Sequence, residues 1–294
     1  MRNKADVLNR AGRILRSLGI RPSKLPGGRY FFRVLSALVG DLTIKVEGLY
    51  LTGSFWHRRE LWKMQEGYYE KFTMQLFKKT LAPGMVVCDI GAHIGFYSLI
   101  AARKVGSRGR VYAFEPDPRT FPYLVRNIKQ NGFSELIVPV KKAVSNQEGV
   151  LRLHLDEVTG GDTSLFHRDT SGRTIEVQSI KLDDFLPNQV KVDVIKMDIE
   201  GGETVALEGM ENVLKRSSDV KMFVECNPDM LHKAGSSVED LLLKLHSLGF
   251  EVKVINDELE RLEMVESSEI YAMAKNAKGP TWSVNLYCSK IQGD

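Results

Sequence analysis

Short apolar runs alternate with longer amphipathic segments from residue 86 onward, and this alternation is the strongest constraint on the fold. The apolar runs include MVVCDIG, RVYAFEP, ELIVPVKKAVS, VDVIKMDIE, DVKMFVECNP and FEVKVIND. Strands buried on both faces have nearly continuous apolar sequences, and parallel strands need long, usually helical, connections. The pattern therefore predicts an α/β domain in which helices cover both faces of a mostly parallel sheet.

The sequence divides into a basic N-terminal region and one larger domain. We expect residues 1–80 to form an accessory region that contains an amphipathic helix, a β-hairpin at Glu47-Gly48 and a further helix. Residues 81–294 are expected to form the α/β domain, with a polar, β-rich insertion at about 149–185.

The basic charge is concentrated at the N-terminus. Residues 1–40 contain nine lysines and arginines and one acid, whereas the whole chain has a net charge of +4. Such an arm suits a nucleic acid or an anionic membrane surface. The favoured interpretation is that its apolar stripe packs on the protein itself, so nucleic-acid binding and peripheral membrane contact remain alternatives.

Cysteine usage and hydropathy indicate the compartment. The three cysteines lie far apart and form no CxxC pair, which predicts neither a disulfide framework nor a zinc site. No run approaches the roughly 18 apolar residues of a membrane span, and no secretory signal pattern is present at the N-terminus. We expect a cytoplasmic protein whose membrane contact, if it has any, is peripheral.

The segment CDIGAHIGFYSLIA, residues 88–101, leads from a strand through a glycine-containing turn into a helix. A nicotinamide-binding turn would carry GxGxxG, but Gly91 is followed by Ala92, His93, Ile94 and only then Gly95. The remaining pattern is DxGxxxG, which begins with Asp89. This acid would repel a pyrophosphate and suits a cationic cofactor instead.

The next strand ends in YAFEPDP, so Glu115 and Pro116 follow its tip. An acid at this position can accept hydrogen bonds from both hydroxyls of a ribose. A ribose-binding acid beside a turn suited to a sulfonium and an amino group predicts S-adenosylmethionine as the cofactor.

Three segments resemble the FkbM family of S-adenosylmethionine-dependent methyltransferases: VVCDIGAHIGFYSLIAA, VYAFEPDP and IKMDIEGGETVALEGM. GYYEKF, IEVQSIKLDDFL and the closing SVNLYCSK extend the resemblance over about residues 65–290. It implies a Rossmann-like class I methyltransferase fold with a seven-stranded, mostly parallel sheet and an antiparallel last strand. The activity it implies is usually methylation of a hydroxyl.

The resemblance also implies which residues bind the cofactor. The DxGxxxG turn would line the methionine half, the acid after the second strand would hold the ribose, and the backbone after the third strand would support adenine. His93 stands where the family frequently has asparagine. The implied cofactor residues are Glu70, Asp89, Gly91, Ala92, His93, Gly95, Glu115, Pro116, Lys142, Ala143 and Asp198.

The segment IKMDIEGGE carries the candidate catalytic residues. Strand alternation points Lys196, Asp198 and Glu200 to one side of the chain, and Glu225 of FVECNP ends the neighbouring strand. The three acids could bind a divalent metal that makes an acceptor hydroxyl more acidic. Alternatively a carboxylate, or His93, acts as a general base with Lys196 orienting it. The sequence favours direct acid–base catalysis and positioning, without a metal.

The resulting functional prediction is methyl transfer from S-adenosylmethionine to a hydroxyl of a sugar, a glycan or another small metabolite. One alternative is an RNA methyltransferase that uses the basic arm. However, no RNA-binding module precedes the domain, and the fourth strand is followed by DIEGGE rather than an NPP-type motif. A second alternative is a binding protein that keeps the fold but has no catalytic activity. The acids retained at both strand ends argue against this alternative.

Overall fold

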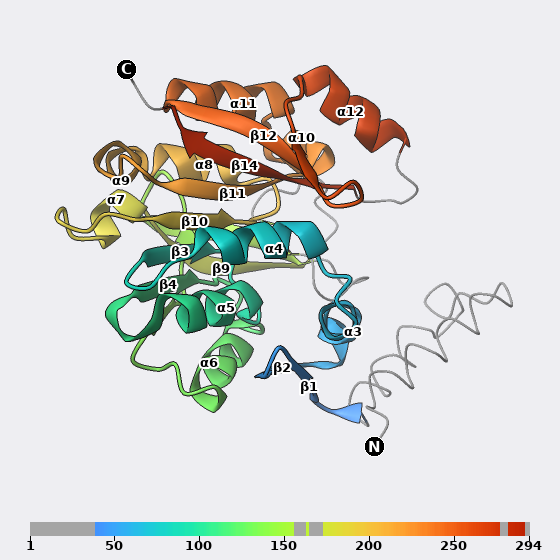
Figure 1. The fold of residues 1–294 in the computed structure, drawn as a ribbon, viewed down its shortest axis with the longest axis vertical. Coiled ribbons are helices and arrows are strands. Elements are labelled where there is room, and N and C mark those ends of the chain that lie inside the picture. The colour runs from blue at the N-terminus through green and yellow to red at the C-terminus, as the bar shows by residue number, and fades with distance from the viewer. Residues whose placement is uncertain (1–38, 156–162, 165–172, 277–281, 292–294) are drawn as a thin grey trace, which may run out of the picture.

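The computed structural model describes residues 39–155, 163–164, 173–276 and 282–291 (Figure 1). The basic arm and its predicted amphipathic helix lie outside these residues. Within them, no helix is long and apolar enough to cross a membrane.

An eight-stranded sheet forms the centre of the molecule, in the order β13-β12-β14-β11-β10-β3-β4-β5. The pairs from β11 through β10, β3 and β4 to β5 are parallel, whereas β14 runs antiparallel to both β11 and β12. The mostly parallel sheet with an antiparallel last strand is thus confirmed, and the short edge strand β13 adds to the seven expected. The strands are β3 (Val86–Ile90), β4 (Arg110–Phe114), β5 (Ile137–Val140), β10 (Val194–Met197), β11 (Lys221–Cys226), β12 (Phe250–Asn256), β13 (Arg261–Glu263) and β14 (Val284–Lys290).

Helices cover both faces of this sheet (Figure 1). They are α4 (Lys71–Thr80), α5 (Phe96–Val105), α6 (Phe121–Gln130), α7 (Leu182–Phe185), α8 (Glu203–Glu208), α9 (Glu211–Arg216), α10 (Pro228–Ala234), α11 (Val238–Ser247) and α12 (Ser267–Asn276), with the 3₁₀ turn η3 (Gly106–Arg108) after α5. On one face, Val87 and Val194 pack in the same core cluster as Leu99 of α5 and Phe77 of α4. Because side chains alternate along a strand, Asp89 and Lys196 point to this same face.

The predicted insertion forms a smaller sheet in the order β6-β9-β7-β8. Its strands are β6 (Ala143–Val144), β7 (Gly149–Leu155), β8 (Thr163–Ser164) and β9 (Arg173–Ile180). Leu153 and Val177 pack with Ala143 in a small apolar cluster. The insertion therefore has its own core and lies next to the segment that follows β5.

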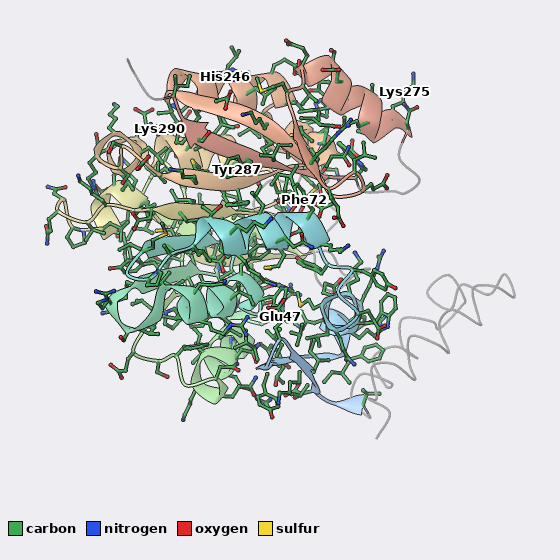
Figure 2. The ribbon with its side chains drawn as sticks, viewed as in Figure 1. Glu47, Phe72, His246, Lys275, Tyr287 and Lys290 are labelled. Carbon is green, nitrogen blue, oxygen red and sulfur yellow. The ribbon has the colours of Figure 1, made fainter. Side chains whose placement is uncertain are left out.

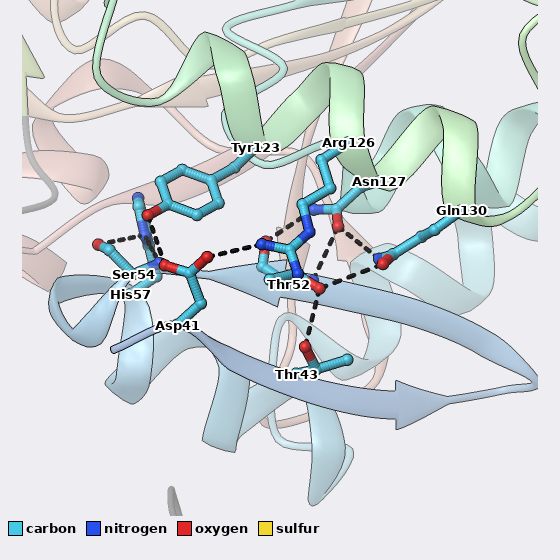
Figure 3. Close-up of polar contacts among 9 residues, drawn as sticks. All are labelled: Asp41, Thr43, Thr52, Ser54, His57, Tyr123, Arg126, Asn127 and Gln130. Carbon is cyan, nitrogen blue, oxygen red and sulfur yellow. Dashed lines mark hydrogen bonds and ion pairs between the residues drawn. The ribbon is translucent and has the colours of Figure 1, made fainter. Parts of the chain in front are cut away.

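The N-terminal hairpin is fastened to the main domain by α6 (Figure 3). It consists of β1 (Leu42–Val46) and β2 (Leu49–Gly53), and is followed by η2 (Phe55–His57) and α3 (Arg58–Gln65). The buried side chain of Asn127 accepts a hydrogen bond from Thr52 N at 2.8 Å and donates to Thr52 O at 2.9 Å. The same amide donates to Ile94 O at 2.8 Å. One residue of α6 thus ties the hairpin to the turn after β3.

Helix α4 is anchored by an acid from the other end of the chain. The Asp257 carboxylate accepts hydrogen bonds from the backbone N–H groups of Phe72 and Thr73 at 2.7 and 3.1 Å. Figure 2 shows Phe72 at the start of this helix, beside the C-terminal strands. A carboxylate at a helix N-terminus satisfies free N–H groups and interacts favourably with the helix dipole. The contact therefore fixes α4 over the sheet.

Candidate active site

A pocket lies at the carboxyl ends of β3, β4 and β10. This is the edge at which open α/β sheets bind their ligands. Most of the predicted site residues line it: Asp89, Gly91, Ala92, His93, Glu115, Pro116, Lys142, Ala143, Lys196, Asp198 and Glu200. Segments more than 100 residues apart in the sequence therefore share one site.

Three predicted residues are not part of the pocket lining. Glu70 lies behind it and accepts a hydrogen bond from the hydroxyl of Tyr97, which does line the pocket. Glu225 lies beside Asp198. Gly95 begins α5 with a φ of +93°, and a Cβ there would lie 2.7 Å from Leu124 Cδ1. The structure thus gives Gly95 a packing role between α5 and α6, and its contact with the cofactor stays a prediction.

Gly91 lies where the ends of β3 and β10 approach each other closely. Its φ is +84°, and an added Cβ would lie 1.8 Å from the carbonyl oxygen of Asp198. Gly91 N donates to Phe114 O at 3.0 Å, and Asp198 N donates to Ile90 O at 2.9 Å. Only glycine fits here, because any side chain would separate β3 from β10.

Glu115 is held by the backbone at the β4 side of the pocket. Its side chain is buried, and it accepts hydrogen bonds from His93 N at 2.9 Å and Asp117 N at 2.8 Å, one on each carboxylate oxygen. Burial raises the pKa of Glu115 to about 8, although the two N–H donors favour its charged form. Each oxygen keeps one further lone pair, which can accept a ribose hydroxyl.

Asp89 and His93 form the wall beside this acid. Asp89 accepts a hydrogen bond from the hydroxyl of Ser98, and burial raises its pKa to about 6. Burial lowers the pKa of His93, whose ring packs edge-on against His57 with centroids 4.8 Å apart. His93 is therefore a neutral wall residue whose backbone N–H, rather than its imidazole, holds Glu115.

Lys196 occupies the β10 side of the pocket. It is 1% exposed, its Nζ lies 3.5 Å from Asp198 Oδ2 and 3.2 Å from Asn285 Oδ1, and it sits 5.2 Å from the centroid of the Tyr97 ring. Burial alone would lower the pKa of this lysine, but the carboxylates around it outweigh burial and raise the pKa. Lys196 is a fixed cation aimed at Asp198.

Three acids gather around this lysine, as the strand pattern predicts. One carboxylate oxygen from each of Asp198, Glu200 and Glu225 lies within 4.8 Å of the other two. Burial raises the pKa of Glu225, and the neighbouring carboxylates Asp198 and Glu200 raise it further. This side of the pocket therefore carries more negative charge than Lys196 neutralises.

Three of the five non-glycine residues with positive φ in the described part of the chain lie at or beside the pocket, and the other two, Glu47 and Glu260, lie in hairpin turns. Glu70, His93 and Glu200 have φ values of +43°, +52° and +53°, in the left-handed region that residues with a Cβ rarely adopt. Such conformations cost of order 1–3 kcal/mol and persist where the surrounding structure enforces them. Their position beside the same pocket is typical of a functional site.

Sequence reasoning missed several residues of the pocket, some of them apolar neighbours of the predicted residues and others from elements whose position depends on tertiary packing. Glu60 and Met64 occupy successive turns of α3, which the hairpin carries to the pocket mouth. The GYYE segment, which contains Tyr69, matches the family pattern, but that match does not predict that Tyr69 lines the pocket. Val144 belongs to the segment after the third strand that was expected beside adenine, and it also lines the pocket. The lining residues missed are Glu60, Met64, Tyr69, Ile90, Ile94, Phe96, Tyr97, Phe114, Leu153 and Ile199.

The sequence matches the model of the methyltransferase FkbM domain over residues 89–252. This is more than half of the chain, and it spans both sides of the pocket. The chain belongs to the FkbM methyltransferase family. It is therefore an S-adenosylmethionine-dependent methyltransferase, as the turn after β3 and the acid after β4 predict.

Two curated relatives are named methyltransferases. The hexuronic acid methyltransferase AglP of Haloferax volcanii is 24% identical over 172 residues, which are 58% of this chain and 68% of that protein. Methyltransferase 1 of Beauveria bassiana is 25% identical over 147 residues, which are 43% of this chain and 58% of that protein. The matched part of the chain thus spans about two thirds of the length of the first relative and somewhat less of the second.

Solved structures similar to the chain include other methyltransferases. An S-adenosylmethionine-dependent O-methyltransferase from Thermotoga maritima is 15% identical, with 86% of this chain and 78% of that chain covered and a TM-score of 0.43. An rRNA methylase from Streptococcus thermophilus is 13% identical, with 76% and 96% covered and a TM-score of 0.45. The strand order and the family match, rather than these scores, carry the assignment.

The residues of the pocket fit S-adenosylmethionine. Glu115 has free lone pairs for two hydroxyls, and Gly91 leaves the backbone open to close approach. The excess of carboxylates near Lys196 suits a ligand with a sulfonium and an ammonium group.

Proposed function

We propose that this protein transfers the methyl group of S-adenosylmethionine to a hydroxyl oxygen of a sugar, a glycan or another small metabolite. The observation that carries the proposal is a single pocket with a ribose-type acid, Glu115, at one side and the Lys196–Asp198 pair at the other. Methyl transfer needs both a held cofactor and an aligned acceptor, and this arrangement supplies a place for each.

The residues after β3, β4 and β5 would hold the cofactor. In this proposal Glu115 accepts the ribose hydroxyls, Lys142 and Ala143 flank the adenine, and Asp89 faces the methionine half. Glu70 acts indirectly, because it accepts a hydrogen bond from the hydroxyl of Tyr97, which lines the pocket. When bound, S-adenosylmethionine supplies an electrophilic methyl group at the β10 side of the pocket.

Asp198 is the proposed acceptor of the hydroxyl proton. Its side chain is 25% exposed and lines the pocket, while Lys196 at 3.5 Å fixes one of its oxygens. A hydroxyl is not ionised near neutral pH, so a positioned carboxylate that takes its proton during attack lowers the barrier. Glu225 and Glu200 complete the charged surroundings of this pair.

A sugar acceptor is supported by the relative from Haloferax volcanii, which is named a hexuronic acid methyltransferase. The pocket also presents carboxylates, two lysines and two tyrosines, which are groups that hydrogen-bond polyhydroxylated ligands. These observations favour a small polar acceptor.

The test is an acceptor screen that measures release of S-adenosylhomocysteine by the purified chain. The panel contains neutral sugars, hexuronic acids, small alcohols and total RNA, each with the wild type and Asp198→Asn. We expect turnover with a hydroxylated small molecule that is lost in the variant. Methylation of RNA alone, or no turnover by a wild type that binds the cofactor, would contradict the proposal.

A further inference from the structure

We infer that Asp198, Glu200 and Glu225 form a binding site for one divalent cation with oxygen ligands, such as Mg²⁺ or Mn²⁺. The inference extends the proposed function, because the site lies beside the proposed acceptor position. It also departs from the expectation drawn from the sequence, which favoured catalysis without a metal.

The spacing of the three carboxylates fits a single ion. The three candidate oxygens, one from each acid, all lie within 4.8 Å of one another. Two oxygens bound to one ion are separated by at most twice the metal–oxygen distance, about 4.2 Å for Mg²⁺ and about 4.8 Å for Ca²⁺. Small rotations of the side chains would therefore bring all three into coordination.

A buried oxygen of Glu225 gives independent support. Its Oε2 atom is shielded from solvent and has no hydrogen-bond partner among the residues that the structure describes. A buried carboxylate oxygen without a partner is costly, and two neighbouring carboxylates increase the cost. Glu225 belongs to β11 and is paired in register with Asn285 of β14, so its backbone position is fixed by the sheet. A bound cation would satisfy this oxygen.

The charge around the cluster also favours a divalent ion. Lys196 faces Oδ2 of Asp198 at 3.5 Å, and its Nζ is shared with Asn285 Oδ1 at 3.2 Å. One lysine beside three carboxylates leaves two negative charges unmatched when all three are ionised. The other carboxylate oxygen of Asp198, Oδ1, can coordinate the cation.

The donor set and its location define the chemistry. Donors that are all carboxylate oxygens select hard cations, such as Mg²⁺, Mn²⁺ or Ca²⁺, over zinc or copper. Asp198 and Glu200 line the pocket, so the open coordination positions would face it. A hydroxyl that completes the coordination loses its proton more readily. The ion would thus assist the proton removal assigned to Asp198.

The experiment is a titration of the full-length protein with MnCl₂, with free Mn²⁺ followed by electron paramagnetic resonance. We expect one equivalent to bind and to be displaced by MgCl₂. Glu225→Gln should weaken Mn²⁺ binding by about tenfold or more. The matched control is Glu115→Gln, which changes an acid of the pocket outside the cluster and should keep Mn²⁺ binding.

Calorimetry with S-adenosylhomocysteine on the same proteins separates this inference from the proposed function. Glu225→Gln should keep most of its affinity, whereas Glu115→Gln should lose it. Glu200→Gln, at a partly exposed position, replaces Glu225→Gln if that variant does not fold. A folded wild type that binds no Mn²⁺, or Mn²⁺ binding unchanged in both cluster variants, would overturn the metal site. Absence of cofactor binding would instead contradict the proposed function.

Discussion

The carboxylates on the two sides of the pocket differ in their hydrogen-bond partners. At the β4 side, each oxygen of Glu115 already accepts a backbone N–H. At the β10 side, Asp198 and Glu225 crowd together, and Glu225 keeps a buried oxygen without a partner among the described residues. The first side is organised by the backbone before any ligand arrives, which suits binding. The second side is left with unmatched charge, which suits a reacting or coordinating partner.

Gly91 joins the two sides. It follows β3, which lies between β4 and β10, and its backbone touches both neighbouring strand ends. If the β4 side binds the cofactor and the β10 side supports catalysis, variants at the β10 side should alter turnover and variants at the β4 side should alter cofactor affinity. A variant at Gly91 should alter both.

The largest expected effect is that of Asp198→Asn on turnover. Loss of a positioned proton acceptor reduces the rate by about 10²- to 10⁴-fold. The measurement is steady-state release of S-adenosylhomocysteine with an acceptor from the screen. Affinity for S-adenosylhomocysteine itself should change only a few-fold. An equal loss of affinity and turnover would mean that the two sides do not divide their roles.

Gly91→Ala is expected to disturb both sides at once. The new Cβ would overlap Asp198 O in a backbone conformation that already disfavours it, so the free energy of unfolding should fall by about 2–4 kcal/mol. Gly84→Ala is the matched control, because its φ of +88° is similar but no atom lies within 4 Å of its added Cβ. This control should lose about 1–2 kcal/mol through backbone strain alone. Urea unfolding of both variants makes the comparison, and equal losses would rule out the close approach.

Glu115→Gln should weaken cofactor binding specifically. A hydrogen bond to a charged group contributes about 1.5–3 kcal/mol, so the dissociation constant should rise about tenfold to a hundredfold. Calorimetric titration with S-adenosylhomocysteine measures this change. Retained affinity in the variant would remove Glu115 from the ribose site.

The pH dependence of cofactor affinity gives a smaller, graded effect. Burial raises the pKa of Glu115 to about 8, and ribose hydroxyls bind its ionised form. Below this pKa binding must release the proton, so affinity should rise with pH by up to about tenfold per unit and level off above pH 8. Asp89, whose pKa is raised to about 6, adds to the pH dependence of the affinity only near pH 6 and below. Affinities measured from pH 6 to 9 should rise in the wild type and vary much less in Glu115→Gln; a fall with pH would contradict the assignment.

The sequence predicted the parts of the site that depend on strand ends. Asp89, Glu115 and Asp198 each lie at or just after the end of a buried strand, and parallel strands bring such ends to one edge. Lining residues from α3 were not predicted, because the position of Glu60 and Met64 depends on how the hairpin docks. That docking depends on the buried amide of Asn127, more than 70 residues away in the sequence. The close approach of Gly95 to Leu124 was not predicted either, because the motif says nothing of the packing between α5 and α6.

We expect S-adenosylhomocysteine to span both sides of the pocket in one direction, and a crystal structure of the complex is the measurement that decides it. Both ribose hydroxyls should lie within hydrogen-bond distance of the Glu115 carboxylate, with adenine beside Ala143 and sulfur on the side of Asp198. A ligand bound in the reverse direction, or outside this pocket, would show that the two sides do not have the roles proposed for them.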